Sequence, residues 1–190
     1  MSEAHFGSTE QPTLSTARLV LRPFLPEDAP AVQRLAGARE IADTTLTIPH
    51  PYPDGAAELW IATHEQGFAA GTVVVFAVTE RESGDVVGAV GLVVEPAHAS
   101  AELGYWIATP YWGRGYATEA AGALVAFALG PLGLHRVQAR HLIRNPASGR
   151  VMQKLGMRLE GVHRHAVRKW DAFEDVALYA ILETDARPEG

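Results

Sequence analysis

Alternating hydrophobic and polar positions mark a series of half-buried strands in the first part of the chain. In the first strand Leu19 and Leu21 lie on one side, and Pro23 and Pro26 end the run. The second and third are rich in β-branched residues and are joined by Glu-Arg-Glu-Ser-Gly, which indicates a hairpin. The pattern predicts strands, the last three antiparallel and side by side, at 18–24, 72–79, 85–94 and 101–107.

Two helices are expected between the first two of these strands. The segment 25–37 has Glu27 and Asp28 in its first turn, where the helix dipole favours negative charge. A second helix is expected at about 54–66. Between them, prolines at positions 49, 51 and 53 require an extended chain over 43–55.

After the fourth strand the apolar spacing becomes helical. Alanine, leucine and valine recur on one face of a long helix, which Gly130 and Pro131 end. The order then continues as strand, short helix and two strands. The expected elements are a helix at 116–129, a strand at 135–142, a helix at 146–155, and strands at 158–167 and 173–182.

These elements indicate an α/β chain of the α+β kind. The expected sheet is mixed and mostly antiparallel, with about six to seven strands flanked by about four helices. With 190 residues the chain is long enough for one domain with a substantial core. We expect a flexible N-terminal segment at 1–16, a single domain at 17–184 and a tail at 185–190.

Composition narrows the possible chemistry. Cysteine is absent, which excludes thiol nucleophiles, thiolate metal sites and disulfides. No uncharged run is long and continuous enough to span a bilayer, and the N-terminus lacks the basic and apolar runs of a signal peptide. We therefore expect a soluble cytoplasmic protein.

Charge is unevenly distributed. The net charge is −6, yet residues 111–170 hold ten lysines and arginines against two glutamates. A basic segment in an acidic protein indicates a local polyanion site, while solvated charges at the ends of helices and strands are the alternative. Nucleic acid is not an expected partner, because it would require a continuous patch that alternate residues Arg136, Arg140 and Arg144 do not establish.

The sequence PYWGRGYATEA at 110–120 places two glycines, Gly113 and Gly115, between a strand and a helix. Glycines there let backbone N–H groups approach a phosphate, and the helix N-terminus adds about half a positive charge. A tight strand-to-helix turn would also need glycine. No Gly-Lys-Ser/Thr follows, and Thr118 stands where a dinucleotide-binding loop would have its third glycine, so two common phosphate motifs are excluded.

Four segments together resemble the GNAT superfamily of acyl-CoA-dependent N-acetyltransferases, in particular its RimJ/RimL-like branch, which acetylates protein N-terminal amines. They are YWGRGYATEA, RNPASGRVMQKLGM, AELGYWI and the closing EDVALYAIL. The similarity covers about residues 14–183. It implies the GNAT fold, acetyl-CoA (coenzyme A) as co-substrate, no metal, and a primary amine as acceptor.

The resemblance also implies how the coenzyme binds. Gly115 and Ala117 match the family's pyrophosphate-binding pattern, which places the diphosphate on the amides from Gly113 to Thr118, a segment that includes Arg114 and Tyr116. Trp112 departs from the Arg or Gln usual in the superfamily, although it is usual in this branch. Asn145 matches the residue that contacts the pantetheine arm, and a role as cap of the following helix is compatible with that contact.

The same resemblance implies the catalytic residues. Many family members carry a tyrosine four residues after position 148 that protonates the departing thiolate; here that position is Met152, so no phenol is expected and Ser148 is the implied donor. Glu102 matches the family's general base, acting directly or through water. Ser148 as a small residue in a helix's first turn and Glu102 as a solvent-facing strand residue are the structural alternatives.

Two further expectations concern the transferred group. Without cysteine an acetyl-cysteine intermediate is excluded, so the amine attacks the thioester directly. The oxygen that becomes negative needs a fixed donor, which in this family is a backbone N–H before the glycine loop, here near Ile107 or Ala108.

The acceptor is less constrained. Tyr52 and Trp106, together with Trp60 and Tyr105, are candidates for an acceptor groove, although aromatic residues at such spacing are more often part of a core. An N-terminal amine of a ribosomal or other protein is the leading acceptor. A small amine such as an amino acid, polyamine or antibiotic, or a non-catalytic acyl-CoA-binding regulatory module, remains the alternative.

The last part of the sequence gives two weaker hints. His163 and His165 fall on one face of a predicted strand, but two histidines without a third ligand are more often surface residues, so no metal site is expected. Exposed strand edges at the C-terminus would allow two copies to pair as a homodimer.

Overall fold

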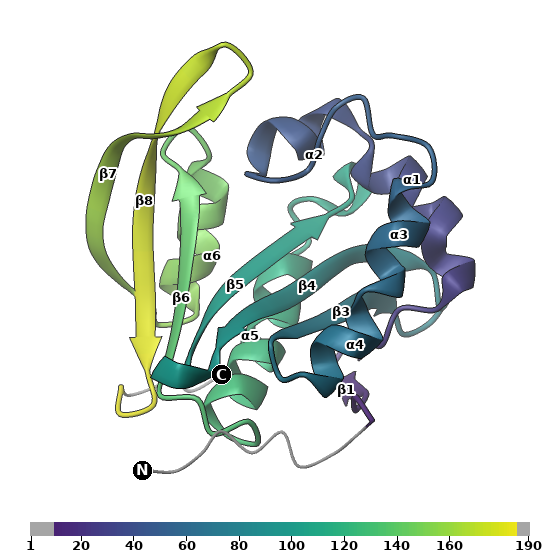
Figure 1. Cartoon of the computed structure of the whole chain (residues 1–190), viewed down its shortest axis with the longest axis horizontal. Helices are drawn as coiled ribbons and strands as arrows, with labels where there is room; N and C mark the ends of the chain where they lie inside the picture. The colour runs from purple at the N-terminus through teal and green to yellow at the C-terminus, as the bar shows by residue number, and fades with distance from the viewer. Residues whose placement is uncertain (1–9, 186–190) are drawn as a thin grey trace.

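A computed structural model describes residues 10–185, which form one mixed sheet of eight strands with six α-helices (Figure 1). The strands are β1 (Leu14–Ser15), β2 (Leu19–Arg22), β3 (Val73–Glu80), β4 (Val86–Glu95), β5 (Ser100–Ile107), β6 (Arg136–Leu142), β7 (Arg158–Lys169) and β8 (Ala172–Leu182). The helices are α1 (Ala29–Ala36), α2 (Arg39–Thr44), α3 (Ala56–Ala62), α4 (His64–Ala69), α5 (Tyr116–Leu129) and α6 (Pro146–Lys154).

The strand order is β1-β2-β3-β4-β5-β6-β8-β7, with every neighbouring pair antiparallel except β5 and β6. That parallel pair is short: only Ser100–Leu103 pairs with Arg136–Ala139. Beyond Leu103 the two strands diverge, as Figure 1 shows near the middle of the sheet. The predicted fold class, the hairpin of β3 with β4 and the closing pair of β7 with β8 are confirmed.

Alternation along β3 explains why both faces of the sheet are covered. Val74, Phe76 and Val78 are fully buried in a cluster with α5, while Ala77 faces a second cluster with α1 and α3. The α5 contribution is its predicted apolar stripe, including Leu124 at 0% exposure. The sheet is therefore the middle layer between α5 with α6 and α1 to α4 (Figure 1).

Two helix predictions need correction. The single helix expected at about 54–66 is divided into α3 and α4 at Thr63, whose hydroxyl donates to the Trp60 carbonyl at 2.7 Å and so competes with the helical hydrogen bonds. The second correction is α2, which sequence patterning missed and which includes Asp43 and Thr44 from the segment expected to be extended. Its six residues are held by burial of Ile41 and Ala42.

The chain ends bear on the predicted domain limits. Of the segment 1–16 expected to be flexible, residues 1–9 lie outside the described residues. Leu14–Ser15, however, forms the edge strand β1, which raises the number of strands from the expected six to seven to eight. Of the expected tail at 185–190, residues 186–190 also lie outside them. None of the helices in residues 10–185 has the length and apolar composition needed to cross a membrane.

Candidate active site

Two cavities meet where β5 and β6 diverge. The glycine-loop cavity, of about 500 Å³, is bounded by the segment Tyr111–Gly113, the start of α5 and one side of α6. The Gly104 cavity, of about 660 Å³, lies on the α1 to α4 side and extends over Gly104. Five residues line both: Thr44, Thr45, Tyr105, Trp106 and Ser148. A reaction between groups bound in the two cavities would take place among these five.

The backbone of β5 offers hydrogen-bonding groups at this junction. Ala108 N–H donates to Val87 O at 2.8 Å, so antiparallel alternation directs the N–H groups of Tyr105 and Ile107 away from β4 and toward β6. Because the β5–β6 ladder stops at Leu103, those two N–H groups have no strand partner within the described residues. Ala108, predicted as one possible donor, is therefore already engaged, and Ile107 is the remaining one of the two.

The glycine loop has the backbone geometry that its sequence predicts. Gly113 and Gly115 have φ of 77° and 81°, in the left-handed region that favours glycine, and Gly115 is the N-cap of the fourteen-residue helix α5. Around this turn the predicted residues Gly113, Gly115, Tyr116, Ala117 and Thr118 line the glycine-loop cavity. The positive end of the α5 dipole is therefore directed at that cavity.

Side chains behind the loop hold it in place. Arg18 forms an ion pair with Glu119 at 2.6 Å, and its Nη1 donates to the Arg114 carbonyl at 2.9 Å. Tyr116 Oη donates to Glu80 at 2.6 Å, and that carboxylate lies 3.8 Å from Arg114. The Arg114 side chain thus faces Glu80 and does not line the cavity, and the prediction for Arg114 concerns its backbone N–H alone.

Helix α6 forms the opposite wall. The Asn145 side chain accepts from Ser148 N–H at 3.3 Å and donates to Thr44 O at 3.3 Å, so the predicted cap is confirmed and both ends of the amide are engaged. Arg150 and Lys154 also line the glycine-loop cavity. Sequence reasoning missed these two cations, although their i, i+4 spacing on the predicted helix places them on one face.

A phenol reaches Ser148 from another element. Tyr105 Oη lies 2.8 Å from Ser148 Oγ and donates to the Ser148 carbonyl at 3.2 Å. Burial raises the pKa of Tyr105 to about 12, so the phenol keeps its proton at neutral pH. The expectation that no phenol is available, drawn from Met152, is therefore wrong, because β5 supplies one.

The Gly104 cavity contains one carboxylate and one guanidinium among its lining residues, Glu102 and Arg140. Arg140 Nε donates to Glu102 Oε1 at 2.7 Å, and no described residue accepts a hydrogen bond from its two terminal nitrogens. A Cβ on Gly104 would meet nothing within 4 Å, so the floor next to this pair is open. The predicted strand face of Glu102, Gly104 and Trp106 thus faces a cavity.

Aromatic residues of the Gly104 cavity serve both as lining and as core. Tyr52 and Trp106 line the Gly104 cavity and also pack in the cluster with α1 and α3. Trp60 lies edge-on to His64, with ring centroids 4.4 Å apart, and burial lowers the pKa of His64 to about 4. His64 is therefore neutral at physiological pH.

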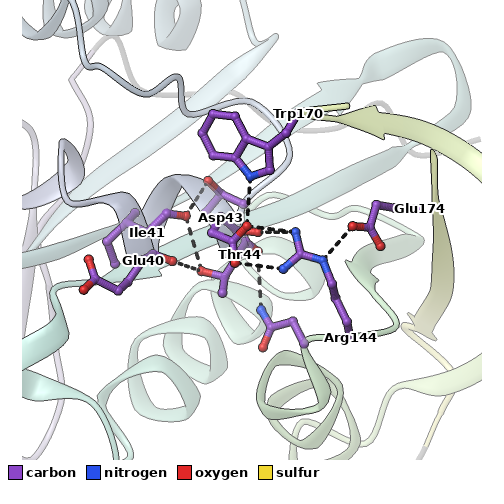
Figure 2. Close-up of polar contacts among 9 residues, drawn as sticks. Glu40, Ile41, Asp43, Thr44, Arg144, Trp170 and Glu174 are labelled. Atoms are coloured by element: carbon purple, nitrogen blue, oxygen red, sulfur yellow. Dashed lines mark hydrogen bonds and ion pairs between the residues drawn. The ribbon is translucent and has the colours of Figure 1, made fainter. Parts of the chain in front are cut away.

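A polar clasp, formed by Asp43, Arg144, Trp170 and Glu174, joins three distant segments over the junction (Figure 2). Arg144 Nη1 and Nη2 donate to the Asp43 carboxylate at 2.9 and 3.1 Å, and its Nε donates to Glu174 at 2.7 Å. Trp170 Nε1, near the tip of the β7–β8 hairpin, donates to Asp43 Oδ1 at 2.9 Å. The clasp fixes the end of α2, and with it Thr44 and Thr45, against the turn that precedes α6.

The histidines considered for a metal site and the arginines considered for a nucleic-acid patch have other surroundings in the structure. Within residues 10–185 no group of three or more metal-ligating side chains is found. His165 has φ of 50° in a break of the β7–β8 register, so the alternation that would place it beside His163 fails. Arg136 pairs with Glu160, as Arg140 and Arg144 pair with their own carboxylates.

Comparisons with known proteins agree with this geometry. A family model described as an acetyltransferase (GNAT) domain matches residues 18–158. The uncharacterized N-acetyltransferase YoaA of Bacillus subtilis (strain 168) is 27% identical over 173 residues, covering 90% of this chain and 97% of that protein. A ribosomal-protein-serine acetyltransferase of Escherichia coli (strain K12) is 29% identical over 123 residues, covering 64% and 65%.

Among solved structures, Mycobacterium smegmatis RimJ in complex with CoA-disulfide has 25% identity to this chain. It superposes with a TM-score of 0.78 and covers 89% of this chain and 85% of that one.

Proposed function

Because the chain belongs to the GNAT acetyltransferase family, we propose that it transfers the acetyl group of acetyl-CoA to the N-terminal amine of a protein. The observation that carries the proposal is the junction of the two cavities at the divergence of β5 and β6. One cavity has the features of an acyl-donor site, and the other has the features of an amine site.

The glycine-loop cavity suits the coenzyme. Backbone N–H groups from Gly113 to Thr118 and the N-terminus of α5 would hold the diphosphate. Arg150 and Lys154 on the facing wall add two positive charges for phosphate groups. Toward the junction, the unpaired N–H of Ile107 would stabilise the thioester oxygen as it becomes negative. Asn145 borders this path and holds α6 in position.

The Gly104 cavity suits a single amine. Glu102 is the proposed base, because it is the carboxylate beside the open floor at Gly104. Its partner Arg140 keeps the carboxylate oriented through Nε and leaves two donors for a carbonyl or carboxylate of the acceptor. Ser148, at the junction, is the proposed proton donor to the departing sulfur. Tyr52 and Trp106 would contact the first residues of the acceptor.

Acid–base chemistry favours an N-terminal amine over a lysine. A protein α-amine has a pKa of about 7.7 to 8.0 and lysine about 10.4, so near pH 7.5 about a third of the former and only about 0.1% of the latter is neutral. An amine that is already neutral when it binds has to give up only the proton released as its bond to the acyl carbon forms, and Glu102 is placed to accept that proton.

The charge of the cavity favours the N-terminal acceptor over a polyamine or aminoglycoside. Such polycations are held by several carboxylates, and this cavity has Glu102 alone, already paired with Arg140. The relative named as a ribosomal-protein-serine acetyltransferase, at 29% identity, supports the same choice of acceptor.

The proposal is tested by adding peptides that begin with Ser or Ala, free amino acids and spermidine to protein with acetyl-CoA, and measuring thiol release. Peptide-dependent release is expected. Glu102→Gln should lower kcat by more than about tenfold with the Kd for acetyl-CoA unchanged, since a general base contributes at least 10²-fold in most enzymes. Release with spermidine or amino acids alone would move the acceptor to the small-amine class. Binding without release for any amine would indicate a regulatory module.

A further inference from the structure

Tyr105 lies at the junction, and its phenol has no part in the roles proposed for Glu102 and Ser148. The chain has five tyrosines, all within residues 10–185, and only Tyr105 lines both cavities. Of the others, Tyr52 lines only the Gly104 cavity, Tyr111 and Tyr116 line only the glycine-loop cavity, and Tyr179 lines neither. Tyr116 donates to Glu80, and Tyr179 accepts from Gln153. The residue that could have carried a phenol on α6 is Met152, which is 1% exposed and has no proton to give.

We propose that Tyr105 is a further catalytic residue, whose phenol supplies, through Ser148 Oγ, the proton that the leaving sulfur takes up. The proposal deepens the proposed function and rests on it. It commits to a direction for the 2.8 Å contact: the single phenol proton, which can also reach the Ser148 carbonyl at 3.2 Å, is donated to Ser148 Oγ during transfer, and the serine hydroxyl proton is turned toward the sulfur.

The amine nitrogen forms a bond to the acyl carbon and loses one proton, which Glu102 accepts. The C–S bond breaks, and the sulfur leaves with its electron pair and takes the Ser148 hydroxyl proton. Ser148 Oγ in turn takes the phenol proton, so one negative charge remains on the Tyr105 oxygen until solvent returns a proton to it as products leave. Glu102 releases its proton to solvent in the same stage.

The relay explains why a serine alone is insufficient. An aliphatic hydroxyl is a much weaker acid than a phenol, so a proton taken from Ser148 without replacement would leave an unfavourable alkoxide. With Tyr105 behind it, the negative charge moves to a phenolate, where the ring delocalises it. Burial ensures that the phenol holds its proton at the start of each cycle.

Position supports a role in chemistry beyond packing. Tyr105 belongs to the part of β5 that has no strand partner on its β6 side, so its backbone and its phenol border the same gap. Its ring nevertheless packs against the cluster under α5, which restricts where the hydroxyl can lie. A rigid ring with its hydroxyl at the meeting point of two substrates is a preorganised donor.

The first experiment titrates the thiol of bound coenzyme A by its thiolate absorbance, in wild type, Tyr105→Phe, Ser148→Ala and the control Tyr179→Phe. Tyr179 is a buried phenol next to α6 that lines neither cavity. A donor at the sulfur stabilises the thiolate, so Tyr105→Phe should raise the pKa of the bound thiol by about one pH unit. Tyr179→Phe should leave it unchanged. Retained melting temperature and Kd for coenzyme A show that each variant is folded.

The second experiment measures kcat with the best acceptor. Tyr105→Phe and Ser148→Ala should each lower kcat by about 100-fold, and the double variant should be no worse than either, because the two groups act in one relay. An unchanged thiol pKa in Tyr105→Phe together with a raised one in Ser148→Ala would overturn the proposal and leave serine as sole donor. Additive losses in kcat would overturn the relay as well.

The two proposals fail differently. If coenzyme A binds and no amine is acetylated, the proposed function fails, while the thiol titration still decides whether Tyr105 serves the sulfur. If peptides are acetylated and Tyr105→Phe behaves as wild type in both experiments, the relay fails and the proposed function stands.

Discussion

Each cavity contributes one wall to the junction: the glycine-loop wall belongs to the glycine-loop cavity, and the Gly104 wall belongs to the Gly104 cavity. The two walls are built in opposite ways. The glycine-loop wall comes from one continuous stretch, in which Gly113, Gly115 and the first turn of α5 follow one another in the chain. The Gly104 wall is assembled from β5, β6, α3, the end of α2 and the loop that follows it. One wall offers mainly backbone groups and a helix end, and the other offers side chains brought from distant segments.

This difference has a mechanistic meaning. A diphosphate is the same in every reaction, so a site made from backbone N–H groups can be fixed by a short motif. An acceptor varies, and a wall assembled from several segments can change its shape without disturbing the sheet. Substitutions on the first wall should therefore act on donor binding, and those on the second on acceptor use.

The largest effect is expected at Gly115, whose φ of 81° a branched side chain adopts only with strain. Gly115→Val should weaken the Kd for acetyl-CoA by about 100-fold, because left-handed backbone costs an ordinary residue about 1–2 kcal/mol and a β-branched one more. Calorimetric titration measures it. Donor binding at wild-type strength would contradict the assignment of the loop.

The matched change on the other wall is Gly104→Val, at a glycine without positive φ and with open space above it. The valine should fill the floor of the Gly104 cavity, the proposed acceptor site, and raise the KM for peptide by about tenfold, roughly the discrimination that one to two misplaced methyl groups produce. The Kd for acetyl-CoA should not change. If Gly104→Val weakened the binding of acetyl-CoA, the two walls could not be assigned to different substrates.

Arg140→Gln examines the ion pair of the acceptor wall. Because Arg140 orients Glu102 through a 2.7 Å hydrogen bond, its loss should lower kcat/KM for peptide by about tenfold, in the range for a charge-assisted hydrogen bond. Arg136→Gln is the control, since Arg136 is on the same strand as Arg140, pairs with Glu160 of β7 and lines neither cavity. Steady-state kinetics with both substrates varied gives kcat/KM for each variant. Equal losses of kcat/KM in Arg140→Gln and Arg136→Gln would count against a specific role of Arg140.

The clasp should give a smaller effect. Trp170→Phe removes the 2.9 Å bond from Nε1 to Asp43 and keeps an aromatic ring at the hairpin tip. Loss of one such bond at a partly exposed site should raise the KM for peptide by about threefold. Phe173→Leu, on the same hairpin and 63% exposed, is the control. A change in donor Kd instead would mean that the clasp acts on the other wall.

The smallest expected effect is a change in how the melting temperature depends on pH when Asp43 is replaced. The hydrogen bond from Trp170 and the contacts with Arg144 hold the pKa of Asp43 below its usual value of 3.8. A carboxyl with a depressed pKa stabilises the folded form at any pH above its usual pKa, and that contribution is lost as pH falls through the lower pKa of the folded state. The melting temperature of Asp43→Asn should therefore lie below wild type at pH 6, and the difference should shrink only once pH falls below the usual value of 3.8. Parallel curves over the whole range would show that Asp43 is not a titrating member of the clasp.

The glycine-loop wall could be predicted from the sequence, whereas the contacts of the Gly104 wall and of the clasp could not. Strands, the long helix and the glycine loop are encoded in local spacing, and the residues from Gly113 to Thr118 could be named because they are contiguous. Tyr105 and Ser148 are 43 residues apart, and Glu102 and Arg140 are 38 apart, so no local pattern announces either pair. Arg144 and Asp43, 101 residues apart, meet only through tertiary structure.

The missed helix illustrates the physical limit. Six residues cannot form a stable helix by propensity alone, and α2 exists because Ile41 and Ala42 are buried against elements far along the chain. Thr44 and Thr45, which border both cavities, inherit their position from that packing. Sequence patterns carry no signal for an element of this kind, because its stabilising partners lie outside any local window.

The short β5–β6 ladder also has a consequence for the lifetime of the protein. The two parts of the sheet share only four residue pairs, from Ser100 to Leu103, so the gap beyond them is a seam at which hydrogen exchange should be fastest within the sheet. A donor bound in that gap binds the native form only, and at a concentration of 100 times its Kd it would add about 2.7 kcal/mol to the unfolding free energy. Bound donor would therefore also lower the rate at which a protease cleaves the transiently opened protein.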